Sequence, residues 1–416
     1  MYFAQKNPAK TVVGIVCEYN PFHSGHAWMI EQLRRQGAEA VVCVMSGPFV
    51  QRAEAAYLPT YLRARAAVAG GADLVFRLPV AWAVASAEGF AYAAVGLLAA
   101  LGCVQGLAFG AETADTGRLW QVAEGLEEEG FKQALQEELK KGVSFAAARA
   151  AAVEASRPGA GQLLREPNNI LAIEYCKALQ RGFSFGEKHL RAEDLPSPLA
   201  MPRKGAGHDR PPEEGIASAS WLRKLARTDG AEALSPYVPI ACQAVYRQAA
   251  GEGRWLDEHR YELAMLSRLR GMSPERFKEQ PGAGEGLENR LAVAANRAVH
   301  LAELYDMAKT KRYAHSRIRR LALAAALGLP PKVQRVPPFL HLLAASDKGL
   351  SLLKKSKQGC MLPLSTSLAR LGREGDAARQ AALLEAKAED FFALCLQSPQ
   401  PGGEAFTRPV QIVSRK

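Results

Sequence analysis

Two histidines stand three positions apart, directly after an apolar run. His23 and His26 enclose Ser24 and Gly25, and the run Thr11–Cys17 (TVVGIVC) precedes them. Two imidazoles in one turn can both donate hydrogen bonds to a phosphate, and a glycine permits a close backbone approach. Such donors stabilise the charge that develops at an α-phosphate during in-line displacement. The pair indicates nucleotidyl transfer; two solvated loop histidines or a metal-binding pair are the alternatives.

The elements around the histidines predict where they lie. The predicted strands are 11–17, 40–45, 73–78 and 106–110, and helical segments near 27–36, 58–69 and up to 101 separate them. This alternation predicts an α/β fold, with a doubly wound, Rossmann-like parallel sheet. In such a sheet the ligand lies where strands end and helices begin, and a helix N-terminus favours phosphate. The histidines follow the first strand, which is the expected place.

The sequence pattern changes after about residue 220, from strand-like apolar runs to helical periodicity. Segments 262–269, 287–305 and 318–327 carry Leu and Ala with Arg and Glu at helical spacing. This periodicity is typical of amphipathic helices. We therefore expect a nucleotidyltransferase-like domain over 1–222, an α-helical region over 223–400 and a flexible tail over 401–416. The stretch 196–212 is rich in Pro, Gly and Arg, which predicts a loop.

A basic stretch in the second region suggests a nucleic-acid partner. The chain carries 53 Lys and Arg against 42 Asp and Glu, a net charge of +11, which favours polyanions. Six cations without an acid among them stand at Lys309, Lys311, Arg312, Arg317, Arg319 and Arg320. On a helix, residues three or four apart share a face, so part of this set could form a stripe that binds RNA. A solvated helix face is the alternative reading.

Composition argues against several classes of protein. The most apolar stretches, 80–101 and 321–330, are rich in alanine, and the first contains Glu88, so neither predicts a membrane span. The N-terminal residues lack the apolar core of a signal peptide. The seven cysteines are scattered and never spaced as CxxC, which argues against a disulfide framework or a structural zinc site. We expect a cytoplasmic protein without a membrane partner.

The string EYNPFHSGH around the two histidines resembles the HxGH signature of the nucleotidyltransferase superfamily, in the version carried by the bacterial tRNA(Met) cytidine acetate ligase family. Further blocks are similar to those of that family and follow in the same order. They are MSGPFVQR at 45–52, GADLV at 71–75, FGAE at 109–112, EPNNILA at 166–172, RKGAGHD at 203–209, IASASWLR at 216–223 and KRYAHSRIRR at 311–320.

This resemblance implies a two-step reaction. Such enzymes activate acetate with ATP to acetyl-adenylate, and then transfer the acetyl group to N4 of the wobble cytidine of elongator tRNA(Met). The resemblance makes His23 and His26 catalytic. Because ATP chemistry nearly always involves Mg²⁺, we expect the ion to accompany ATP, although the sequence indicates no protein ligand for it. The residues expected to contact ATP are Val16, Cys17, Glu18, Tyr19, Asn20, Pro21, Phe22, His23, Ser24, Gly25, His26, Ala27, Trp28, Met29, Gly110, Asn168, Arg203, Lys204, Ser218, Ser220 and Arg223.

Several of these residues also have a simpler structural interpretation, based on their neighbours in the sequence alone. Gly110 could be a turn glycine, and Asn168 and Asn169 could cap a helix over 170–179. The pattern SxSxxR is equally typical of an N-capped helix with a solvated arginine, and Arg203 and Lys204 in a Pro/Gly-rich loop would ordinarily face solvent. For the basic stretch, Arg317 or Arg320 could instead reach the nucleotide or the interdomain packing.

The chain also departs from the family pattern. Ala53 and Ala55 stand where the family continues with Gly and Pro, Arg77 replaces a usual acid, and Pro48 replaces a common Asn. Of the expected binding positions, that of acetate is the least defined by the sequence, because these departures fall near the expected mouth of the pocket. They also keep two rivals open: an HxGH adenylyltransferase that acts on a small metabolite, and a catalytically idle tRNA-binding relative.

Overall fold

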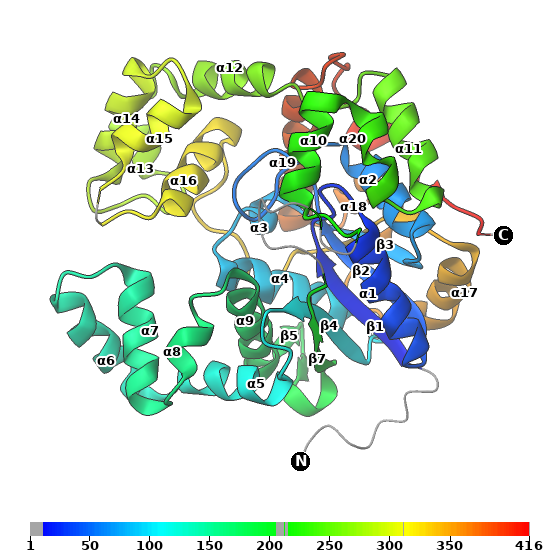
Figure 1. The fold of residues 1–416 in the computed structure, drawn as a ribbon, viewed down its shortest axis with the longest axis horizontal. Coiled ribbons are helices and arrows are strands. Elements are labelled where there is room, and N and C mark those ends of the chain that lie inside the picture. Colours follow the sequence, from blue (N-terminus) through cyan, green and yellow to red (C-terminus); the bar gives the residue numbers. More distant parts are fainter. Residues whose placement is uncertain (1–10, 205–211, 213–214, 311, 416) are drawn as a thin grey trace.

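The computed structural model describes residues 11–204, 212, 215–310 and 312–415 and contains a mixed β-sheet flanked by helices (Figure 1). Five strands are parallel in the spatial order β3-β2-β1-β4-β7, so the chain winds outward first on one side of β1 and then on the other. The predicted doubly wound α/β fold is confirmed. These strands are β1 (Thr11–Cys17), β2 (Ala38–Ser46), β3 (Leu74–Leu78), β4 (Gly106–Ala111) and β7 (Ser197–Pro202).

The central strands are apolar on both sides because both faces of the sheet are covered. Val41, Cys43 and Met45 of β2 belong to one core, which includes residues of α1 and α2. Val42 and Val44 belong to the opposite core, which includes residues of α4 and α9. A nearly continuous apolar run such as AVVCVM is what a strand buried on both faces requires.

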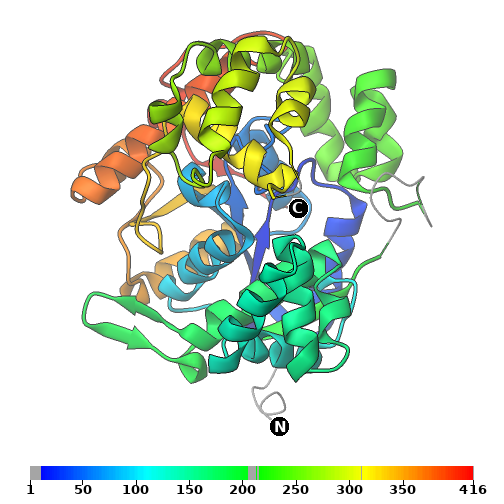
Figure 2. The ribbon, with the colours of Figure 1, turned by 90° about the vertical axis from the view of Figure 1, so that its left-hand side faces the viewer.

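The helices fall into groups along the chain. The first part of the chain contains α1 (Ser24–Arg35), α2 (Thr60–Ala69), α3 (Val80–Ala83), α4 (Ala87–Ala100), α5 (Thr116–Gly125), α6 (Glu129–Lys140), α7 (Phe145–Ser156), α8 (Ala160–Leu163) and α9 (Pro167–Arg181). The later part contains α10 (Ala219–Asp229), α11 (Ile240–Gly251), α12 (Glu258–Leu269), α13 (Pro274–Lys278), α14 (Leu287–Arg297), α15 (Leu301–Ala308), α16 (His315–Leu327), α17 (Asp347–Ser356), α18 (Leu368–Leu371), α19 (Asp376–Leu394) and α20 (Glu404–Thr407). Figures 1 and 2 show α13–α16 and α6–α8 as two separate helical groups on the same side of the molecule.

The C-terminal part of the chain is not purely helical, which differs from the expected division. Strand β8 (Leu340–Ala345) pairs antiparallel with β3, and both β9 (Leu364–Ser365) and β10 (Gln411–Ile412) pair parallel with β8. Residues 401–415 therefore contribute α20 and β10 rather than a flexible tail, and the expected boundary at 222/223 falls inside α10. The run LHLLAA of β8 is a short Leu/Ala sequence, which periodicity alone cannot assign to a strand or a helix.

Strand β7 lies inside the stretch 196–212 that we expected to form a loop. It contains Pro198 and Pro202, which cannot donate a ladder hydrogen bond. Because β7 is the last of the described strands in this sheet, one of its edges has no partner among them, and proline is tolerated there. A separate two-stranded hairpin, β5 (Phe183–Phe185) and β6 (Lys188–Leu190), precedes it. Within the described residues, no helix has both the length and the apolar character that crossing a bilayer requires.

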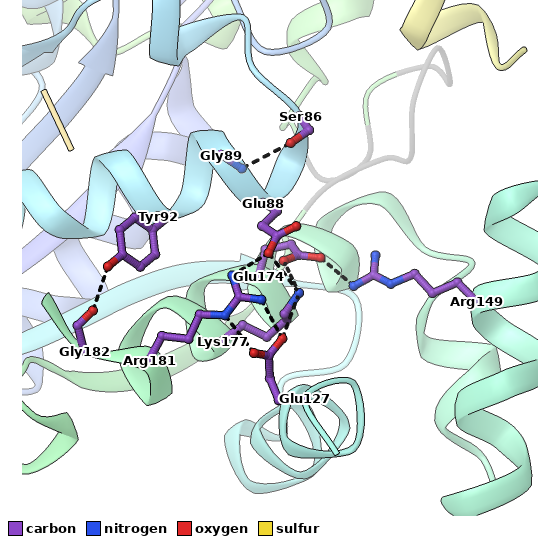
Figure 3. A network of polar contacts seen from close by, with 10 residues as sticks. All are labelled: Ser86, Glu88, Gly89, Tyr92, Glu127, Arg149, Glu174, Lys177, Arg181 and Gly182. Atoms are coloured by element: carbon purple, nitrogen blue, oxygen red, sulfur yellow. Dashed lines mark hydrogen bonds and ion pairs between the residues drawn. The ribbon is translucent and has the colours of Figure 1, made fainter. Parts of the chain in front are cut away.

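A network of charged side chains joins α9 to three neighbouring segments (Figure 3). The Lys177 Nζ lies 3.6 Å from Glu88 of α4, 3.4 Å from Glu127, which follows α5, and 3.2 Å from Glu174 of α9 itself. Arg181 pairs with Glu88 and Glu127, and Arg149 of α7 pairs with Glu174. The network therefore fixes α9, whose N-terminal end carries Asn168, against the helices around it.

Lys177→Met is expected to reduce the free energy of unfolding by about 2 kcal/mol, chiefly because it removes one of the two cations beside the buried Glu174 carboxylate. Glu88 and Glu127 are more exposed and keep Arg181, so they contribute less. Urea denaturation measures the change. Arg35→Met is the matched control: the Arg35–Glu31 pair is exposed, and its loss should cost at most about 1 kcal/mol. Equal effects of the two substitutions would contradict a stabilising role for the network.

Candidate functional site

The two histidines form one hydrogen-bonded unit where β1 leads into α1. His23 is the N-cap residue of α1, and its Nδ1 accepts the Gly25 N–H at 3.1 Å. The Nδ1 of His26 accepts the His23 N–H at 3.3 Å, and the two rings stack with their centroids 3.7 Å apart. Because each Nδ1 is an acceptor, each neutral ring carries its proton on Nε2. The pair thus presents two Nε2–H donors.

Burial keeps both imidazoles uncharged. Desolvation, assisted by the nearby Arg203 guanidinium, lowers the pKa of His23 to about 3. Desolvation lowers the pKa of His26 well below its usual value, and His23 and Arg203 add to the effect. Two stacked imidazoliums would repel each other, whereas the neutral pair can donate hydrogen bonds at physiological pH.

In the nucleotide-free protein, we expect neither His23 nor His26 to bind a proton between about pH 8 and pH 5. Their NMR ring-proton shifts should stay constant, whereas the ring-proton shifts of the exposed His300, whose pKa its hydrogen bond with Glu262 raises, should change at a pH above the ordinary histidine value. The unfolded chain protonates these imidazoles near pH 6.5, so their contribution to stability is lost as pH falls from there toward the folded-state pKa values. Titration of either ring near pH 6.5 would contradict the buried neutral pair.

A cavity of about 310 Å³ lies against the histidines, which is large enough for a nucleotide-sized ligand. The loop after β1, the ends of β4 and β7, and the N-terminal ends of α9 and α10 surround it. The sequence-predicted residues that line it are Val16, Cys17, Glu18, Tyr19, Asn20, His23, Gly25, His26, Trp28, Met29, Gly110, Asn168, Arg203, Lys204, Ser218, Ser220 and Arg223. The structure thus brings together most of the expected site.

Four expected residues do not line the cavity: Pro21, Phe22, Ser24 and Ala27. Phe22 is fully buried and packs edge-on against the Tyr19 ring. The Ser24 hydroxyl donates to the Tyr237 carbonyl at 2.8 Å. Ser24 and Ala27 share a face of the first turn of α1, and the histidines take another face. The segment 16–29 therefore contributes most of its positions to the cavity, and these four positions pack elsewhere.

The N-terminal end of α9 is capped from another segment. Glu112 accepts the Asn168 N–H at 3.3 Å and the Asn169 N–H at 2.8 Å, and its carboxylate also accepts from the Asn168 side chain. Asn168 is not the N-cap residue, since that position belongs to Glu166. The Arg203 Nη1 lies 3.8 Å from Glu112, so one carboxylate positions two residues of the cavity wall. Sequence reasoning missed this role, although Glu112 belongs to a matched block.

The SxSxxR segment forms the start of α10, which agrees with the N-capped helix that this pattern predicted. The Ser218 Oγ caps the helix by accepting the Trp221 N–H at 3.3 Å, and it lies 3.1 Å from the Ser220 Oγ. Arg223 is not a solvated arginine. Its Nη1 donates to the Asn20 carbonyl at 2.8 Å, and burial lowers its pKa. A mostly desolvated guanidinium at the cavity wall suits an anionic phosphate.

A second set of cavity residues comes from the segment after β2, which the sequence reading did not assign to the nucleotide. Gln51, Arg52 and Glu54 line the cavity, and the Gln51 N–H donates to the Glu18 carboxylate at 2.9 Å. Burial raises the pKa of Glu18, and the charges of Arg52 and Arg223 partly offset this effect. Residues 50–52 (VQR) belong to the matched block MSGPFVQR, so the sequence did contain a signal for this part of the cavity.

The ends of β1 and β2 are held by one fully buried cation. Arg63 of α2 donates to the carbonyls of Leu58 and Ser46, both at 3.0 Å, and to those of Glu18 and Gly47. Four carbonyls therefore share one guanidinium, and one of them belongs to Glu18, which lines the cavity. Arg77, the departure at β3, lies elsewhere: it is buried against Glu385 and Glu389 of α19 and does not line the nucleotide cavity.

The basic stretch does not form the expected stripe. Helix α15 ends at Ala308 and α16 begins at His315, so the stretch is not one helix; Lys311 lies outside the described residues. Lys309 and Arg312 are exposed. The other three cations pack within the fold: Arg317 pairs with Glu285 at 2.7 Å, Arg319 pairs with Glu54 at 2.6 Å, and burial lowers the pKa of Arg320.

Comparisons with known proteins agree with this geometry. The family model described as HIGH Nucleotidyl Transferase matches residues 10–404. A protein of Acetivibrio thermocellus named tRNA(Met) cytidine acetate ligase is 33% identical over 97% of this chain and 100% of its own length. A protein of the same name from Halothermothrix orenii is 34% identical over 86% of this chain and 87% of its own length.

Solved structures agree as well. The crystal structure of Thermotoga maritima TmcAL bound with alpha-thio ATP aligns with a TM-score of 0.86 at 27% identity, and its apo form with a TM-score of 0.88 at the same identity. Both alignments cover 97% of this chain and 100% of the other. The chain therefore belongs to the tRNA(Met) cytidine acetate ligases, a family of HIGH nucleotidyl transferase enzymes.

Proposed function

We propose that this enzyme activates acetate with ATP to acetyl-adenylate and pyrophosphate, and then acetylates N4 of the wobble cytidine of elongator tRNA(Met). The observation that carries the proposal is the stacked, neutral histidine pair beside the 310 Å³ cavity. Its two Nε2–H donors suit the oxygens of an α-phosphate. The names of the relatives and the ATP analogue bound to the Thermotoga maritima protein support the same reading.

In the first step, an acetate oxygen attacks the α-phosphorus and the bond to the β-phosphate bridging oxygen breaks. His23 and His26 donate to the α-phosphate oxygens as their negative charge grows. Ser218, Ser220 and Arg223 contact the departing β- and γ-phosphates, where a guanidinium can donate two parallel hydrogen bonds. No proton is transferred in this step, which is consistent with histidines that remain neutral.

In the second step, the cytidine N4 attacks the acetyl carbon, the bond from that carbon to the AMP oxygen breaks, and N4 loses one proton. We expect Mg²⁺ to arrive with ATP. In the described part of the chain no group of three or more His, Cys, Asp or Glu side chains is arranged to hold a metal ion. Phosphate oxygens and water are then the expected ligands of Mg²⁺, as is common for nucleotide-bound magnesium.

The experiment is incubation of the protein with ATP, labelled acetate and total tRNA, followed by nucleoside analysis. N4-acetylcytidine should appear only when all three are present. Acetate-dependent ATP–pyrophosphate exchange without tRNA tests the first step alone. Exchange supported by another carboxylate but not by acetate would replace this proposal with a metabolite adenylyltransferase. RNA binding without any exchange would identify an idle relative.

A further inference from the structure

A second cavity adjoins the nucleotide cavity. It has a volume of about 510 Å³, and we call it the basic cavity; the residues that line it are Arg52, Glu54, Ser220, Trp221, Arg223, Lys224 and Arg227. Arg52, Glu54, Ser220 and Arg223 also line the nucleotide cavity. A group bound in the basic cavity would therefore lie next to a nucleotide bound beside the histidines.

The charge of the basic cavity favours an anion. Four of its seven residues are cationic, and its one acid, Glu54, pairs with Arg319 of α16 at 2.6 Å. Arg227 pairs with Glu258 at 2.6 Å, but both side chains are substantially exposed, so this pair is weak and screened. Lys224 is exposed and makes no ion pair with any described residue. Clustered cations of this kind bind phosphates through salt-sensitive attraction.

An aromatic side chain accompanies these cations. Trp221 of α10 lines the basic cavity, is partly exposed, and meets the Tyr237 ring edge-on at a centroid distance of 5.1 Å. Unpaired bases stack on aromatic rings, while neighbouring Lys and Arg contact the backbone. A cavity of this size admits a single splayed-out nucleotide but not a duplex, so its chemistry matches an unpaired RNA segment better than a helix.

The basic stretch at 309–320 is less suited to this task. Arg317 is engaged by Glu285 and by the Gly282 carbonyl at 3.1 Å, and Arg319 is engaged by Glu54. Through Arg319, α16 supports a wall of the basic cavity instead of offering a free cation. The structure therefore shifts the candidate RNA contact from α16 to α10.

We propose that the basic cavity binds the unpaired RNA nucleotide that is to be modified, with Trp221 beside its base and Lys224 and Arg227 on the adjoining phosphates. This inference rests on the proposed function. The inference adds a binding site for the base that receives the acetyl group, next to the acetyl-adenylate. The residues of this binding site that contact RNA belong to α10.

The test is Lys224→Glu, measured with total tRNA as the probe. We expect the tRNA dissociation constant to rise by about tenfold or more near 0.1 M salt, the slope of log K against log salt to become shallower, and acetyl transfer at limiting tRNA to fall in parallel. Acetate-dependent ATP–pyrophosphate exchange needs no RNA and should persist. Lys348→Glu of α17 makes the same charge change outside both cavities and should leave tRNA binding unchanged.

A second variant tests the base contact. Trp221→Ala should weaken binding of a single-stranded, cytidine-containing oligonucleotide by about tenfold, and Trp221→Phe should restore most of the affinity because a ring remains. Wild-type affinity in Lys224→Glu, equal losses in Lys224→Glu and Lys348→Glu, or competition by poly-glutamate as strong as by tRNA would each overturn the inference. Absence of N4-acetylcytidine with the wild-type protein would instead refute the proposed function, whatever the variants bind.

Discussion

His26→Ala is expected to lower acetate-dependent ATP–pyrophosphate exchange by at least about 100-fold, the size of effect seen when one preorganised donor is removed. The substitution removes one of the two Nε2–H donors and also the Nδ1 that accepts the His23 N–H at 3.3 Å. It further removes the ring against which His23 stacks, so the remaining imidazole loses its orientation. Radiolabelled pyrophosphate exchange measures the effect directly.

His26→Asn separates the two roles of the side chain. The asparagine Oδ1 can still accept the His23 N–H, so the start of α1 should keep its cap while the Nε2–H is lost. Exchange should remain as low as in His26→Ala, with a near-normal free energy of unfolding. Ser24→Ala is the neighbouring control, because Ser24 faces away from the cavity and bonds the Tyr237 carbonyl. Substantial exchange in both His26 variants would remove the histidine pair from the chemistry.

The strands nearest to the site could be predicted because their signals are local. The run Thr11–Cys17 is a strand with the same bounds in the structure, and the predicted strand 106–110 differs from β4 by one residue. Strand β8 was missed because LHLLAA carries no periodicity that separates a buried strand from a helix. Its place beside β3 depends on pairing across more than 260 residues, Leu74 with Ala345, which no local pattern encodes.

In the candidate site, too, the residues with local sequence signals could be predicted and the long-range contacts could not. Residues inside one matched block, such as His23 and Ser218, lie on the cavity as expected. The roles that were missed join distant segments: Glu112, which directly follows β4, caps α9, and Arg63 holds the ends of two strands. For the basic stretch, the stripe along one helix was wrong, because the stretch spans the break between α15 and α16 and Arg319 contacts Glu54, 265 residues earlier in the chain. That the stretch binds RNA stays a prediction.

Arg77→Leu is expected to reduce the free energy of unfolding by about 3–5 kcal/mol, because it leaves buried carboxylates without their cation. The Arg77 Nη1 bonds Glu385 and lies 2.7 Å from Glu389, and Glu385 is fully buried. Burial already raises the pKa of Glu385, although Arg77 opposes the shift. Removing Arg77 raises this pKa further, so the variant is least destabilised at low pH and loses stability as pH rises through the folded-state value.

Urea denaturation at pH 5 and pH 8 tests this account, with a double variant as the control. Arg77→Leu combined with Glu385→Gln removes the uncompensated charge and keeps an oxygen that accepts the Val80 N–H, which donates to Glu385 at 2.6 Å. The double variant should be more stable than Arg77→Leu alone, and its stability should vary less with pH. Additive losses would mean that the glutamates do not interact with Arg77.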